Sequence, residues 1–421
     1  PGRTLDFYRT HEGIDWQDRL FRSALMHTHN VSVSGGNKQI RYAVSGSVVD
    51  QDGVIDNSGY RKYQGRISLD TKLNKRVNLS VNANYTHDRT HGQTTSKSLA
   101  SANAYASYLM YRTWAYRPVI LNSKDDDSLF DDENDTSVMN PIISNKNENT
   151  TKKTTTFLSN AKLVWEIIDG LKLTVRAGYG KKTVRQEEFN NSLTFQGFPR
   201  AGNNKGVNAS FGERVLEDWM NENTLVYKRE FNNKHKFDVT VGYTMQGTVS
   251  SNYGFGTSYI PHEFLGMSGM DDGIPYSTTA VLSENALMSW LGRVNYSYRS
   301  RYMFTASFRA DGSSKFTPGN RWGIFPSGAF AWRLGQEKFM RKLKFVDDAK
   351  LRVSYGVTGN NRIGDFATYP SLTQSDYYSF GNGTPSEAVV PNNLGNKDLT
   401  WESTDQTNIG LDLSLFNDRV T

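Results

Sequence analysis

The segment Asp125–Asp135, DDDSLFDDEND, is the densest group of potential metal ligands in the 421-residue chain. Its carboxylates recur at spacings of one and two residues, and oxygen ligands of this kind bind Ca²⁺. The segment lacks the glycine and the terminal glutamate of an EF-hand loop. Because dense like charge usually marks a solvated segment, we interpret it as an acidic external loop. A Ca²⁺ site is the less favoured alternative, with the ligands Asp125, Asp127, Asp131 and Asp132.

Two histidines, His27 and His29, share one face of an expected strand. Two ligands without a third are poor evidence for a metal site, so we favour a non-metal role. The chain has no cysteine, which excludes disulfides and thiolate metal sites. No arrangement of residues resembles a catalytic site, and we expect neither enzymatic activity nor a cofactor.

Two further sets of residues could bind a substrate. Arginines on the polar faces of expected strands could bind an anion, although pairing with acidic residues of neighbouring strands is the favoured interpretation. Aromatic residues in expected loops could stack on sugar rings or hold peptide side chains. Packing among long loops explains these aromatic residues equally well. The arginines are Arg176, Arg293, Arg309 and Arg352, and the aromatic residues are Tyr253, Phe255, Tyr259, Phe264, Tyr276, Tyr377 and Tyr378.

The elements that position these residues are two-faced strands. In Leu351–Val357 and in Ile409–Leu415, apolar and polar residues alternate with the period of a β-strand. The whole chain is rich in Tyr (22), Phe (22) and Gly (36), yet its mean hydropathy is only −0.61. This combination indicates strands with one apolar face, joined by polar loops. No window of about 18 apolar residues predicts a membrane-spanning helix.

The connections between the expected strands alternate between short and long. We expect about 14 strands, with long connections over residues 86–154, about 180–213, 250–284 and 360–398. Two of the strands are expected at Asn221–Lys228 and Phe237–Tyr243. Such alternation is typical of an antiparallel up-and-down β-barrel in an outer membrane, with short periplasmic turns and long extracellular loops. A soluble β-sandwich is the alternative.

Aromatic residues near the expected strand ends are placed as the interface girdles of such a barrel require. The formal charge of +6 could suggest a polyanion partner. However, Lys and Arg are spaced singly along strands and form no dense patch, so we expect no nucleic-acid binding. The girdle candidates are Trp165, Trp290, Tyr298, Tyr302, Trp332 and Tyr355.

Several stretches in the same order resemble one family, the SusC/RagA-type TonB-dependent outer-membrane transporters of Bacteroidetes. They are IDWQDRLFRSALMHTHNVSVSGG (14–36), NPIISN (140–145), RADGSSKF (309–316), NRWGIFPSGAFAWRL (320–334), LRVSYGVTGNN (351–361) and NKDLTWESTDQTNIGLDLSLFNDR (396–419). The resemblance implies a barrel of about 22 strands. Residues 1–421 would be part of the barrel domain, an internal fragment from which the plug, the TonB box and the N-terminal extension are absent.

The resemblance also implies partners and a function. The partners would be a SusD-like surface lipoprotein, the TonB–ExbB–ExbD complex acting through the plug, membrane lipid with lipopolysaccharide, and a large nutrient. The function would be active import across the outer membrane, with a glycan favoured over an oligopeptide. A surface receptor or assembly component that transports nothing is a further alternative, and a soluble carbohydrate-binding β-protein is the third.

Overall fold

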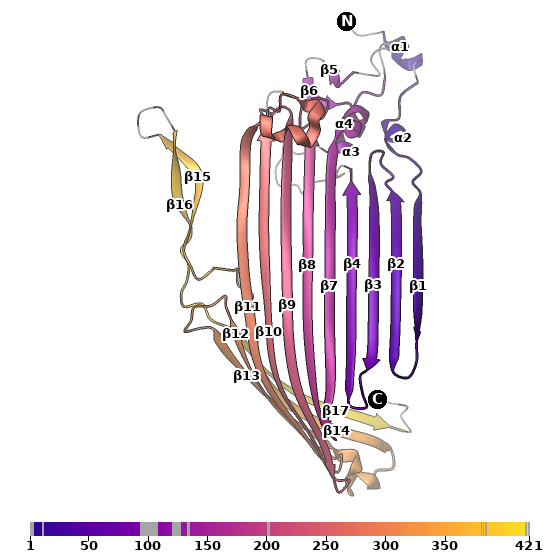
Figure 1. Ribbon diagram of the computed structural model, residues 1–421, viewed down its shortest axis with the longest axis vertical. Helices are drawn as coiled ribbons and strands as arrows, with labels where there is room; N and C mark the ends of the chain where they lie inside the picture. The colour runs from indigo at the N-terminus through magenta and orange to yellow at the C-terminus, as the bar shows by residue number, and fades with distance from the viewer. Residues whose placement is uncertain are drawn as a thin grey trace.

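The computed structural model describes residues 4–10, 12–92, 108–119, 128–132, 135–199, 203–379, 381, 383, 385–416 and 419. Most of them form one antiparallel sheet of thirteen strands in the described residues, and each strand pairs with the next along the chain (Figure 1). The order begins at β1 and ends at β17, so the wall is not closed. The strands of this sheet are β1 (Met26–Gly36), β2 (Ile40–Asp52), β3 (Gly59–Lys72), β4 (Val77–His91), β7 (Asn149–Ile168), β8 (Leu171–Asn190), β9 (Asn208–Phe231), β10 (His235–Ser258), β11 (Ile274–Tyr298), β12 (Tyr302–Ser313), β13 (Trp322–Arg333), β14 (Val346–Asn360) and β17 (Glu402–Leu415).

Short elements lie in the connections. Two hairpins, β5–β6 and β15–β16, pair separately from the large sheet. Figure 1 shows the β15–β16 hairpin standing away from the wall. No helix in the described residues is long and apolar enough to cross a membrane. These elements are α1 (Leu5–Thr10), α2 (Trp16–Leu20), α3 (Leu109–Ala115), β5 (Phe130–Asp132), β6 (Asp135–Met139), α4 (Pro141–Asn147), η3 (Glu263–Asp272), η4 (Leu334–Gln336), η5 (Met340–Lys342), β15 (Ser371–Ser379) and β16 (Pro385–Asn393).

The sheet has a turn end and a loop end. Connections 37–39, 73–76, 169–170, 232–234, 299–301 and 334–345 lie at the turn end, and connections 53–58, 92–148, 191–207, 259–273, 314–321 and 361–401 lie at the loop end. Connection 334–345, which contains η4 and η5, is the one long connection at the turn end among these. The two-residue turn between β7 and β8 depends on Gly170, whose φ is +85°. The alternation expected from the sequence is thus confirmed, and with a single continuous sheet the soluble sandwich is wrong.

The strands near the middle of the sheet are longer than the sequence pattern predicts. β8 continues to Asn190, β9 and β10 each contain 24 residues, and β11 contains 25. The expected loop over 250–284 is therefore wrong, because the connection there covers only 259–273. Likewise, the long connection expected over 86–154 covers only 92–148. The strands continue where the alternation of apolar and polar residues stops.

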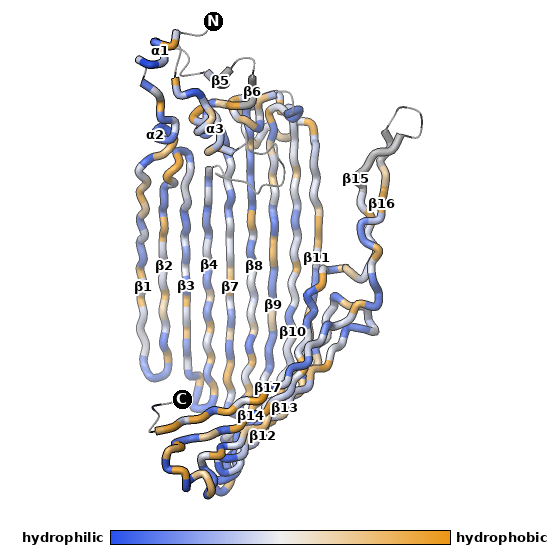
Figure 2. The backbone as a smooth tube through the Cα atoms, turned by 180° about the vertical axis from the view of Figure 1, so that it is seen from behind, coloured by the Kyte–Doolittle hydropathy of each residue, from blue (hydrophilic) through white to orange (hydrophobic). Residues whose placement is uncertain are grey.

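One face of the sheet carries an apolar band, and we call it the outer face because this face of a membrane barrel contacts lipid. On three strands, aromatic residues of this face lie eight residues apart, which is about 27 Å along a strand and close to the height of a barrel's apolar band. Figure 2 shows hydrophobic residues along the strands. The three pairs are Trp165 and Phe157, Tyr227 and Trp219, and Tyr298 and Trp290.

The upper edge of this band descends regularly across the sheet. The comparison is clearest on β4, β8, β10, β12 and β14, which alternate with the other strands of the sheet. When each of these strands is compared with the one named before it through the strand pairing, its run of apolar outer residues ends two residues nearer the turn end. A drop of about 7 Å for every two strands, which are about 9.6 Å apart, corresponds to a strand tilt of about 35°. Membrane barrels have tilts of 35–45°. The residues at this edge are Tyr85, Tyr179, Met245, Ala310 and Val357.

Candidate functional site

A row of polar side chains crosses the inner face near the loop end. Gln51, Tyr60, Thr90, Lys152 and Gln186 are directly paired from β2 through β3, β4 and β7 to β8. We call these five residues the inner row. At a spacing of about 4.8 Å between strands, the row extends for about 19 Å. Residues that are paired in this way point to the same face, so the row presents a continuous polar strip.

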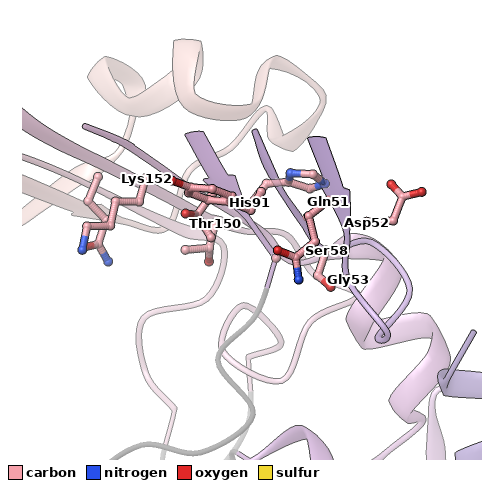
Figure 3. Close-up of a pocket in the computed structure, with 12 residues that line it drawn as sticks. Gln51, Asp52, Gly53, Ser58, His91, Thr150 and Lys152 are labelled. Atoms are coloured by element: carbon pink, nitrogen blue, oxygen red, sulfur yellow. The ribbon is translucent and has the colours of Figure 1, made fainter. Parts of the chain in front are cut away.

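The inner row lines a hollow of about 570 Å³. Figure 3 shows Gln51, Thr150 and Lys152 among the residues around it. Within the described part of the chain, the side chains of Gln51, Thr90, Lys152 and Gln186 have no hydrogen-bond or ion-pair partner, and all four are exposed. Amides supply donors and acceptors, and the lysine adds a positive charge. The hollow can therefore bind a polar, extended ligand.

The rim of the hollow is held by Arg22, which precedes β1. Its guanidinium donates hydrogen bonds to the carbonyl oxygens of Gly53 and Ser58, at 3.1 and 3.2 Å. It also lies 3.7 Å from a carboxylate oxygen of Asp52. Burial lowers the pKa of His91, and the nearby charges of arginine residues lower it further. Both effects favour the neutral form of the His91 imidazole.

The loop end is braced by a buried ion pair between α3 and the residue that follows α4. Arg112 is fully buried, and its guanidinium lies 3.2 Å from a carboxylate oxygen of Glu148. The hydroxyl of Ser144 accepts from Arg112 and donates to Glu148, both at 2.9 Å. The guanidinium also lies over the Phe195 ring, 5.2 Å from its centroid. Burial raises the pKa of Glu148 and lowers that of Arg112.

The segment before β1 is attached to the same region. The indole of Trp16 donates to the carbonyl of Arg117 at 2.7 Å, and its ring meets the Tyr116 ring edge-on at 5.0 Å. Leu20, Ile55 and Leu109 form a buried apolar cluster beneath. The structure therefore joins residues 14–21, 108–118 and 140–148 in one packed layer beside the hollow, which we call the mouth layer.

The four arginines proposed from the sequence lie on the inner face, and their contacts favour internal pairing. Arg352 lies 2.6 Å from Asp412, Arg309 2.7 Å from Asp311, and Arg176 3.5 Å from Glu222. Arg293 donates to the side-chain oxygen of Asn295 at 3.2 Å. The structure does not bring the four arginines together, since they lie on four different strands, β8, β11, β12 and β14.

The aromatic residues proposed as loop residues are mostly on strands, so this location is corrected. Tyr253 and Phe255 lie on β10, where the alternation places them on the outer face. Tyr276 lies at a bulge in β11, and the Lys205 ammonium lies 4.0 Å from its ring centroid. Only Tyr259 and Phe264 of the first five lie in a connection, Phe264 within η3. Tyr377 and Tyr378 belong to β15, and their side chains lie outside the described residues.

The metal-site alternatives gain no support from contacts. Asp125 and Asp127 lie outside the described residues, and Asp131 and Asp132 belong to β5 with side chains that are not described. The rings of His27 and His29 are 5.5 Å apart on the outer face. Among the described residues, no group of three or more His, Asp or Glu side chains could hold a metal ion.

Comparison with known proteins identifies the architecture. Residues 111–421 match the family model described as TonB dependent receptor-like, beta-barrel. The chain belongs to this family. It is 28% identical to TonB-dependent receptor P3 of Formosa agariphila over 96% of the chain and 40% of that protein. It is 27% identical to TonB-dependent receptor SusC of Bacteroides thetaiotaomicron over 97% of the chain and 41% of that protein.

Among solved structures, the RagAB peptide importer in its open-open state has the same fold, with a TM-score of 0.74 and 22% identity. The match covers 97% of this chain and 44% of that one. The chain thus spans about two fifths of the length of the curated relatives it matches. The resemblance to the SusC/RagA type is confirmed, and the protein is a β-barrel of the bacterial outer membrane. The loop end is therefore extracellular and the turn end periplasmic.

Sequence reasoning missed the inner row and the buried pair of Arg112 and Glu148. The inner row becomes visible only when five strands are placed in register. One signal was available, because NPIISN contains the N-cap Asn140 and Pro141 at the start of a helix. That signal predicts α4, which carries Ser144 into the mouth layer.

Proposed function

We propose that the protein containing this barrel imports a large nutrient across the outer membrane, and that the inner row contacts the nutrient on its way in. The observation that supports this proposal is the unpartnered polar strip on the inner face at the extracellular end. Coupling to TonB through a plug and capture beneath a SusD-like lipoprotein complete the proposal, and both rest on the relatives. A receptor that transports nothing is the alternative.

A glycan is the favoured cargo. The inner row offers two amides, a hydroxyl and a tyrosine, which suit the hydroxyl groups and apolar faces of sugars. Its length of about 19 Å suits an extended oligomer better than a single sugar. An oligopeptide is the second candidate, because the similar fold of RagAB belongs to a peptide importer and amide side chains also bind peptide backbones.

Growth tests distinguish these possibilities. The full-length parent protein would be expressed without its TonB box in the native organism, which is then grown on separate panels of polysaccharides and of peptides. We expect growth to be lost on a polysaccharide. Loss on peptides alone would replace the glycan by a peptide, and unchanged growth on both panels would contradict import.

Substitutions in the inner row test the site itself. Lys152→Gln together with Gln186→Ala should reduce binding of the cargo found in the growth test about fivefold or more, because each lost hydrogen bond contributes about 0.5–1.5 kcal/mol. Lys181→Gln, on the outer face of β8, is the matched control and should bind normally. Equal binding by both variants would exclude the inner row as the contact surface.

A further inference from the structure

The outer face carries four cationic residues in direct register, just above the apolar band. Arg61 pairs with Arg89, Arg89 with Lys153, and Lys153 with Arg185, on the neighbouring strands β3, β4, β7 and β8. We call these four residues the cation row. Like charges placed directly opposite each other in a sheet are destabilising. A row of four such residues therefore calls for an anion that offsets the repulsion.

Acidic neighbours neutralise the cation row only in part. Arg61 lies 2.5 Å from Asp50, while Lys153 and Arg185 share Glu187 at 3.6 and 2.7 Å. Arg89 has no ion-pair partner among the described residues.

Several other charged or titratable groups surround the row. At one end of the row, Glu213 on β9 is paired with Arg185. At the other end, Asp50 on β2 is paired with Arg61, and His27 on β1 is paired with Asp50. His87 lies one level below, where its ring contacts the Thr155 hydroxyl at 3.0 Å. Asp52, His91 and Arg22 lie above, and Arg22 also pairs with Asp56. An excess of positive charge remains around Arg89, and the lowered pKa of His91 is consistent with it.

The height of the row above the membrane indicates the kind of anion. The tyrosines Tyr63, Tyr85 and Tyr179 mark the upper edge of the apolar band on β3, β4 and β8. Counted from these residues toward the loop end, Arg61 lies two residues higher, Arg89 four and Arg185 six. With a tilt of about 35°, the cations lie roughly 5–17 Å above the edge of the apolar band. This is the layer of lipid headgroups, whereas the side chains of Arg61 and Arg185 remain about half exposed, at 56% and 48%.

We propose that the cation row binds the phosphate groups of an outer-leaflet lipid, whose acyl chains lie against the apolar band below. Arginine and lysine donate charge-assisted hydrogen bonds to phosphate oxygens. Four cations across three strand spacings extend over about 14 Å, which is wide enough for a lipid with more than one phosphate. The row thus holds the barrel wall at a fixed depth in the membrane.

Binding of bisphosphorylated lipid A to the full-length parent protein tests the proposal. Arg89→Gln should weaken binding about fivefold, as expected for the loss of one cation near a charged lipid surface. Arg89→Gln with Lys153→Gln should weaken binding further, although the two losses do not simply multiply because the residues are direct neighbours. The double variant leaves no new unpaired carboxylate, since Arg185 still pairs with Glu187. Native mass spectrometry of detergent-solubilised protein titrated with the lipid measures the affinity.

The matched control is Lys62→Gln with Lys182→Gln, which removes two cations from the inner face of the same wall. It should bind lipid A normally, and dephosphorylated lipid A should bind weakly to every variant. Heat-modifiable gel mobility verifies that each variant is folded, and loss of like-charge repulsion should leave Arg89→Gln at least as stable as the parent in lipid-free detergent.

Three results would overturn the proposal. The first is equal binding by the parent and the double variant, and the second is an equal loss in the control. The third is full displacement of lipid A by 10 mM inorganic phosphate, which would assign the row to a free anion. Retention of lipid A against phosphate supports the lipid as the source.

Discussion

Replacing Arg112 by methionine should loosen the mouth layer selectively. The substitution leaves the Glu148 carboxylate, which is 5% exposed, buried without its cation. Breaking one side of a buried ion pair costs about 3–5 kcal/mol. Since about 1.4 kcal/mol changes an equilibrium tenfold, amide hydrogen exchange in residues 108–119 and 140–148 should become roughly 150 to 4,000 times faster. Hydrogen exchange with mass spectrometry on the full-length protein measures this change.

The matched control replaces both partners. Arg112→Met with Glu148→Leu removes the two charges together, and apolar replacement of a whole buried pair is often neutral. We therefore expect exchange in the mouth layer to return to within about tenfold of the parent rate. If Arg112→Met alone exchanges like the parent, the pair does not brace the loop end.

The pH dependence of Arg112→Met follows from the direction of the Glu148 shift. Burial raises the pKa of this carboxyl in the folded state above its value in the unfolded state. Its contribution to stability is thus fully present below the unfolded pKa, about 4.3, and is lost as pH rises through the folded pKa. Exchange in Arg112→Met should therefore slow toward the parent rate as pH falls. A defect that stays constant with pH would refute the reasoning.

Two further substitutions test the membrane wall and its turns. Val241→Lys in the outer band should cost about 2–4 kcal/mol in folding into lipid bilayers, whereas Thr240→Lys on the inner face should cost much less. Equal costs would show that the faces are misassigned. Gly170→Ala should lower the folded yield on heat-modifiable gels, because a Cβ would lie 2.4 Å from the Lys228 carbonyl at a φ of +85°. Normal yield would contradict a strict need for glycine there.

The sequence predicts the strands within the apolar band, where outer residues facing lipid are apolar, but it does not predict their continuation above the band. Between Phe237 and Met245 the outer residues are apolar, so alternation reveals β10. Above the band, outer positions such as Lys181 and Glu217 are charged and form an ion pair of 2.6 Å across the strands. The backbone ladder continues there without any change in hydropathy that alternation could detect, which is why the upper halves of the strands look like loops.

The candidate site is invisible in sequence for a different reason. Members of the inner row, such as Gln51 and Gln186, are 135 positions apart and meet only through the register of four strand pairs. The alternation within one strand predicts which face of the sheet a side chain lies on, but it does not predict which residues of the neighbouring strands lie beside it. The aromatic residues show the same limit, because the sequence pattern places Tyr253 in a loop, whereas it lies on the outer face of β10.

The regular descent of the apolar edge has a consequence for how such walls can change in length. A step of two residues for every two strands preserves which side chains face in and which face out, whereas a step of one residue would exchange them. A β-hairpin is therefore the smallest piece that can be inserted, duplicated or removed while the remaining strands keep both their depth and their facing. The wall is modular in pairs of strands, and new specificity can arise by exchanging whole hairpins together with the loops they carry.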